Sequence, residues 1–98
     1  MPRSLVERRL SEVSTRLRQL RADLAVSDEQ LAHLAEAADD ARLRSLVSET
    51  PLADREHHEA HRHAEAMQRH RAELLEGIAR LEQTQDELLD RLTAQSKQ

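Results

Sequence analysis

Aliphatic and small side chains recur along residues 6–41 at alternating spacings of four and three. This heptad pattern predicts a long helix that buries one narrow stripe against another helix. Its positions are Val6, Leu10, Val13, Leu17, Leu20, Leu24, Ser27, Leu31, Leu34, Ala38 and Ala41. A second series, with the same spacing and the complementary phase, comprises Ala60, Ala64, Met67, Arg71, Leu74, Ile78, Leu81, Gln85, Leu88 and Leu92. We expect the two helices to share one apolar seam.

The segment between the two series carries the signals of a chain reversal. Thr50 is a good N-cap residue, and Pro51 suits the first helical position, where a missing N–H costs nothing. If the chain folds back at residue 49, each seam position of the first helix from Val6 to Ala38 faces one of the second, and the two residue numbers add up to 98. This symmetry favours an antiparallel hairpin over a parallel coil.

The composition agrees with long helices and excludes an ordinary globular core. Phe, Tyr and Trp are absent, Gly occurs once and Pro twice in 98 residues, whereas aromatic side chains normally supply much of the buried area. We therefore predict one all-α domain over residues 1–98, an antiparallel coiled-coil hairpin. Its helices are expected at about 4–47 and 51–95, with a turn at about 48–51.

Two polar pairs interrupt the predicted seam. Ser27 falls opposite Arg71, and Val13 falls opposite Gln85. Such a layer can fix the helix register while the Arg71 guanidinium reaches water. Alternatively, Arg71 contacts an acidic group on a partner protein, and the sequence does not separate the two readings.

Toward the turn the seam becomes thin, because alanines replace the leucines used nearer the termini. Leu43, Leu46, Val47 and Leu52 gather there, mostly outside seam positions. They form either a local apolar cap over the turn or a surface that binds another protein. The candidate partner-binding tip comprises Leu46, Val47, Glu49, Leu52, Asp54 and Glu56.

Leu75 and Leu89 widen the apolar face of the second helix beyond one seam. Homodimerisation into a four-helix bundle would cover them, and broader packing within one hairpin is the alternative.

Charge is distributed unevenly along the chain, whose net charge is −4. Residues 1–22 carry six arginines against two glutamates, a balance of +4, and residues 23–60 carry ten acidic groups against three arginines, a balance of −7. A chain that is acidic overall and lacks stacking aromatics is a poor nucleic-acid binder, so we expect no direct nucleic-acid contact.

No apolar run is long enough for a signal peptide or a membrane span, which predicts a cytoplasmic protein without membrane contact.

Histidines provide the one cluster that suggests chemistry. His57 and His61 stand one helical turn apart, a spacing that can bind Zn²⁺ or Ni²⁺. No third ligand is implied, so surface histidines are the simpler reading, and we assign no metal and no cofactor.

Cysteine is absent, the Ser and Thr residues have no convergent base, and a two-helix fold lacks an enclosing pocket, so we expect no enzyme.

The turn and the residues after it read Thr50-Pro51-Leu52-Ala53-Asp54-Arg55, followed by Glu56-His57-His58-Glu59. This segment resembles the coiled-coil tip of DksA-type transcription factors, in which an Asp-Pro-x-Asp-Arg segment tips an antiparallel hairpin. The Gre factors are similar in architecture and carry an acidic coiled-coil tip into the secondary channel of bacterial RNA polymerase. The resemblance implies a tip that acts near the polymerase active site, with Asp54 and Glu49 or Glu56 as acidic groups. Here Thr50 stands where the first Asp is expected, and no cysteine zinc finger is present.

As a whole, the chain is similar to short uncharacterised helical-hairpin proteins of actinobacteria, a resemblance that implies no activity. The sequence therefore favours a non-enzymatic protein-interaction module, with bacterial RNA polymerase as candidate partner. One alternative is a self-associating adaptor or scaffold that dimerises through Leu75 and Leu89. Another is a metal or pH sensor built on His57 and His61.

Overall fold

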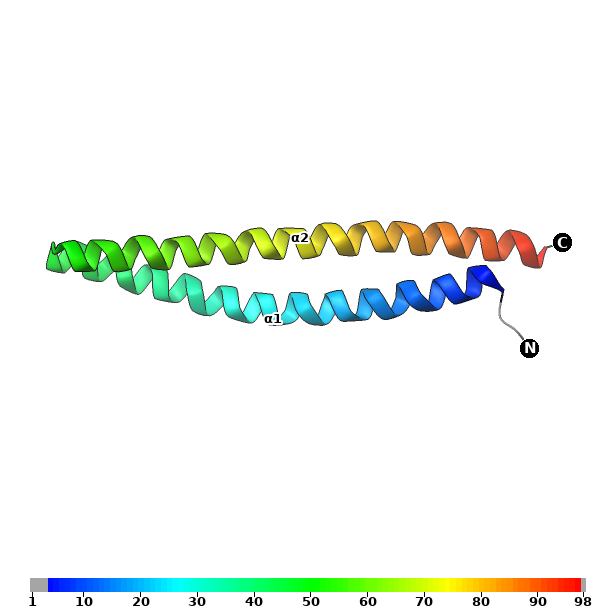
Figure 1. Ribbon diagram of the computed structural model, residues 1–98, viewed down its shortest axis with the longest axis horizontal. Helices are drawn as coiled ribbons and strands as arrows, with labels where there is room; N and C mark the ends of the chain where they lie inside the picture. Colours follow the sequence, from blue (N-terminus) through cyan, green and yellow to red (C-terminus); the bar gives the residue numbers. More distant parts are fainter. Residues whose placement is uncertain (1–3, 98) are drawn as a thin grey trace. The chain divides into compact units, whose positions relative to one another are not determined.

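The computed structural model describes residues 4–97 and contains two α-helices (Figure 1). Helix α1 spans Leu5–Ser48 and helix α2 spans Pro51–Ser96, joined by Glu49 and Thr50. No strand occurs among these described residues. The predicted all-α hairpin of two long helices is confirmed, and the helix ends lie within one residue of the predicted ones. Dimerisation stays a prediction.

Both helices begin at a hydroxyl cap. The backbone N–H of Ala53 donates to Thr50 Oγ1 at 3.1 Å, which confirms Thr50 as the N-cap of α2 with Pro51 at the first helical position. At the start of α1, the N–H of Glu7 donates to Ser4 Oγ at 3.2 Å. The Ser4-x-x-Glu7 spacing has the form of a capping box, so this start could also be read from the sequence.

Glu49 ends α1 in a left-handed conformation with φ of 51°. Its N–H donates to the carbonyl of Ser45 at 3.2 Å, which satisfies one of the last carbonyls of the helix. Glycine is the usual residue at this position, because a side chain makes the left-handed conformation cost about 1–2 kcal/mol. The turn is therefore tight and locally strained at one acidic residue.

The described chain divides into two compact units, each built from one piece of each helix. The terminal unit comprises the described residues up to Asp23 and from Leu74 onward, and the turn unit comprises Leu24–Glu73.

The terminal unit is packed by large aliphatic side chains. Its buried residues are Val6, Leu17, Leu20, Leu74, Ile78 and Leu88. Gly77 faces Leu20, and a Cβ at this position would lie 3.4 Å from Leu20 Cδ1, an ordinary contact distance. A hydrogen bond crosses the seam, where Gln85 Nε2 donates to Ser14 Oγ at 3.3 Å, and an exposed ion pair joins Arg21 to Glu82 at 3.9 Å. This unit resembles an ordinary coiled-coil segment with one polar layer.

The turn unit is packed by small side chains instead. Its buried residues are Ser27, Ala41 and Ala53, whereas Leu31 and Met67 are only half-buried. The Ser27 hydroxyl donates to the Met67 sulfur at 3.4 Å, so the buried hydroxyl is not left without a partner. The thin seam expected near the turn is present, and it buries less apolar surface than the terminal unit.

Every predicted seam position is buried or half-buried in its unit. The seam of α2 also extends toward the turn through His57 and Ala53, which continue the alternating spacing of three and four. His57 is half-buried, and its Nδ1 atom is buried without a hydrogen-bond partner. The interpretation of His57 as a surface residue is therefore wrong, because the heptad phase directs it toward α1.

Candidate protein-binding site

Four large aliphatic side chains near the turn are exposed, and we call them the turn patch: Leu43, Leu46, Val47 and Leu52. Their exposed fractions are 54%, 63%, 85% and 61%, respectively. The local apolar cap that the sequence left open does not form, since none of the four is buried. An exposed aliphatic cluster of this kind is a common mark of a protein-interaction site.

The heptad phase explains why the patch stays exposed. On α1 the seam near the turn passes through Ala41 and Ser45, and these residues are buried or half-buried. The patch residues of α1 are Leu43, Leu46 and Val47, none of which is a seam position. Their spacing of i, i+3 and i+4 places them together on another face of the helix. A two-helix hairpin has no third element to cover that face.

Charged residues of both signs surround the turn patch. Glu49, Asp54 and Glu56 are exposed, as are Arg42, Arg44 and Arg55. Within residues 4–97, none of these six side chains takes part in an ion pair. Glu49 and Asp54 line a shared hollow of about 410 Å³ beside the turn. The tip is thus less uniformly acidic than the sequence reading implied, although its carboxylates are free to contact a partner.

Three histidines of α2 lie close together with their rings tilted against one another. The ring centroids of His57 and His58 lie 5.4 Å apart, and those of His57 and His61 lie 6.4 Å apart. His61 Nε2 lies 2.6 Å from the Glu65 carboxylate, which occupies that nitrogen. Across the described part of the chain, no three His, Asp or Glu side chains come together as a metal site.

Arg71 has a partner within its own unit. Its Nε donates to the Asp28 carboxylate at 2.5 Å, and its side chain is 39% exposed. Gln85 lies two heptads after Arg71 and bonds to Ser14 in the same way. Arg71 and Gln85 thus each bond to the residue that follows a seam position on α1. This repeated geometry supports the register-fixing reading of Arg71 and adds Asp28, which the sequence reading had not paired with it.

Leu75 and Leu89 belong to the terminal unit and are 40% and 47% exposed. Packing within the hairpin therefore covers only part of each side chain. A second apolar surface remains on this unit.

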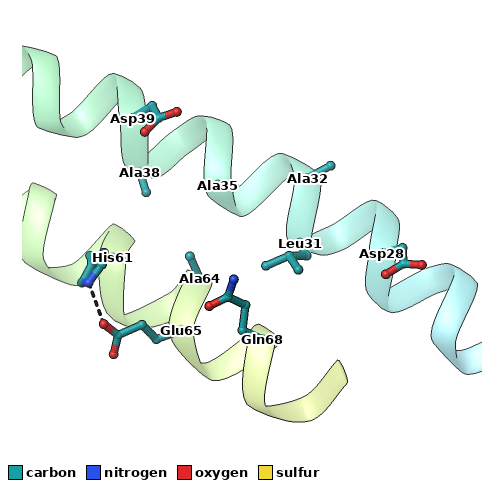
Figure 2. A pocket seen from close by; sticks show the side chains of 10 residues that line it. All are labelled: Asp28, Leu31, Ala32, Ala35, Ala38, Asp39, His61, Ala64, Glu65 and Gln68. Carbon is teal, nitrogen blue, oxygen red and sulfur yellow. Dashed lines mark ion pairs between the residues drawn. The ribbon is translucent and has the colours of Figure 1, made fainter. Parts of the chain in front are cut away.

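The turn unit contains a groove of about 520 Å³ that the sequence reading did not anticipate, and we call it the alanine groove. Its apolar floor consists of Leu31, Ala32, Ala35, Ala38 and Ala64. Its polar rim consists of Asp28, Asp39, His61, Glu65 and Gln68. Figure 2 shows Asp28 and Asp39 at opposite ends of the groove along α1, with the His61–Glu65 pair on the α2 side. Ala38 and Ala64 belong to the thin seam that the sequence predicts, whereas Ala32 and Ala35 lie outside it.

No known protein family, curated protein or solved structure matches the chain. Neither described helix is apolar enough over a sufficient length to cross a membrane.

Proposed function

We propose that this chain is a non-enzymatic protein-interaction module that places the turn patch into an apolar groove of a larger protein. The observation that carries the proposal is the exposure of all four large aliphatic side chains beside the turn. Leu43, Leu46 and Val47 have the i, i+3, i+4 spacing by which a helix docks into a groove. Burying one such side chain contributes roughly 1.5–3 kcal/mol, so this small surface can supply useful affinity.

The turn supports the same proposal through Glu49. Its left-handed conformation would suit glycine better, yet a carboxylate occupies the position and shares a hollow with Asp54. Strained residues are concentrated at functional sites in proteins generally. We infer that Glu49 and Asp54 make the polar contacts that accompany the apolar docking.

We propose that the chain acts in the cytoplasm, and bacterial RNA polymerase is the partner to test first. The reason is that the segment after the turn resembles the tip of the secondary-channel factors. The acidic groups carried over by that resemblance are Asp54, Glu49 and Glu56, all of which are exposed.

The test is a binding titration with purified bacterial RNA polymerase and a fluorescently labelled chain. The double variant Leu46→Gln, Val47→Gln should weaken binding by more than about tenfold, as expected when anchor side chains are lost. The control is Leu5→Gln, Val26→Gln, which alters two other exposed aliphatic residues away from the turn and should bind like the unmodified chain.

Absence of polymerase binding would reject this partner, and crosslinking with mass spectrometry would then identify the proteins that the chain binds. If Leu46→Gln, Val47→Gln and the control double variant capture the same proteins equally well, the turn patch is not the docking surface.

A self-associating scaffold is the second candidate, favoured by the exposure of Leu75 and Leu89. Here Leu75→Gln, Leu89→Gln should abolish a dimer seen by sedimentation velocity. A monomer at micromolar concentration would contradict this alternative.

A further inference from the structure

The alanine groove combines an apolar floor with a rim of one charge sign. Asp28, Asp39 and Glu65 line it, and neither arginine nor lysine does. Asp28 is already paired with Arg71, and Glu65 with His61, whereas Asp39 is in no ion pair within the described residues. The groove is open to solvent and its floor is mostly methyl groups, which leave room for side chains of another molecule.

The complementary surface lies on the same chain. Arg8, Arg9, Arg16 and Arg18 are exposed, and none of them takes part in an ion pair within residues 4–97. These residues account for most of the positive charge of residues 1–22.

Arg9 and Arg16 are seven residues apart, close to two helical turns, and therefore share one side of α1. Asp28 and Asp39 are eleven residues apart, close to three turns, and likewise share one side. Arginine also carries an aliphatic stem, which can cover an apolar floor while the guanidinium reaches a carboxylate at the rim. Leu5, which is exposed at the start of the same helix, adds an apolar side chain to this surface.

We propose that the alanine groove binds the arginine-rich start of α1 from a second copy of the chain. Both segments belong to the single helix α1, which cannot fold back on itself, so the occupant must come from another molecule. This association uses surfaces different from the turn patch and from Leu75 and Leu89, and it does not depend on the proposed function.

The test is sedimentation velocity of the full chain at low and high salt, with one pair of matched variants. Asp39→Arg places a positive charge at the groove, and Asp40→Arg places it on the neighbouring residue, which is also exposed but does not line the groove. We expect a dimer at low salt, weakened by salt because the contact is ionic. Asp39→Arg should raise the dissociation constant by about tenfold or more, and Asp40→Arg should change it by less than about threefold.

A charge exchange gives the sharper result. The double variant Arg9→Glu, Arg16→Glu should lose self-association, and mixing it with Asp39→Arg should restore a mixed dimer. Circular dichroism of each variant checks that the helices remain folded.

Three outcomes would overturn the proposal: a monomer at all salt concentrations, equal effects of Asp39→Arg and Asp40→Arg, or a dimer lost only in Leu75→Gln, Leu89→Gln. The variant Leu46→Gln, Val47→Gln should retain the dimer, so this proposal and the turn-patch proposal can fail separately.

Discussion

The two units of the molecule use the same heptad pattern with different side chains. The terminal unit buries leucines and an isoleucine in its seam, whereas the turn unit buries a serine and two alanines. Burial of a large aliphatic side chain contributes roughly 1.5–3 kcal/mol, several times what an alanine methyl group can contribute. The comparison assigns most of the stability to the terminal unit and leaves the turn unit with the exposed surfaces that suit binding.

The largest expected effect comes from large-to-small substitution in the terminal unit. Leu17→Ala should lower the free energy of unfolding by about 2–5 kcal/mol, because Leu17 is buried and its neighbours cannot fully close the cavity. The matched change in the turn unit, Leu31→Ala, should cost about 1–2 kcal/mol, since Leu31 is only half-buried. Urea denaturation measures both. Equal losses would remove the distinction between the units.

His57→Leu should stabilise the turn unit by about 1–2 kcal/mol. The substitution removes a buried Nδ1 that lacks a hydrogen-bond partner and supplies an aliphatic side chain at a seam position. His58→Leu is the control, because His58 is exposed and its loss should change the stability by less than about 0.5 kcal/mol. A destabilised His57→Leu variant would show that the imidazole makes a needed polar contact.

Glu49→Gly should raise the free energy of unfolding by about 1 kcal/mol. Glycine adopts the left-handed conformation of the turn without a side-chain clash, although its unfolded chain is more flexible. Thermal denaturation measures the gain. If Glu49 also contacts a partner, the same variant should bind more weakly while being more stable, a combination that a purely structural role does not produce.

Gly77→Ala gives the smallest expected effect, a stabilisation of about 0.5–1 kcal/mol from the better helix propensity of alanine. The new methyl group would lie 3.4 Å from Leu20 Cδ1, an ordinary contact distance. A loss of stability in urea denaturation would mean that the helices of the terminal unit need the close approach that glycine allows.

Local patterns made the fold predictable from the sequence. The alternating spacing of seam residues marked the buried face of each helix, and Thr50 with Pro51 marked the start of the second. These features depend on a few neighbouring residues, so a single sequence contains enough information.

Features that depend on side-chain placement were harder to predict. The sequence predicts that Arg71 reaches either water or a partner protein. The pairing with Asp28 depends on how the arginine side chain turns toward α1, which the sequence pattern does not contain. A pattern of apolar residues does not assign His57 to the seam, because its side chain is polar, although Ala53 continues the same spacing. The alanine groove arises from the absence of side-chain volume, which a pattern of apolar residues does not reveal.

The central claim is that the terminal unit provides the stability and the turn unit provides the interaction. Hydrogen exchange with mass spectrometry tests it most directly, measured without and with purified RNA polymerase. We expect slower exchange in the terminal unit of the free chain, and added protection on binding confined to peptides around residues 41–60. Equal exchange in the two units, or added protection only in the terminal unit, would contradict it.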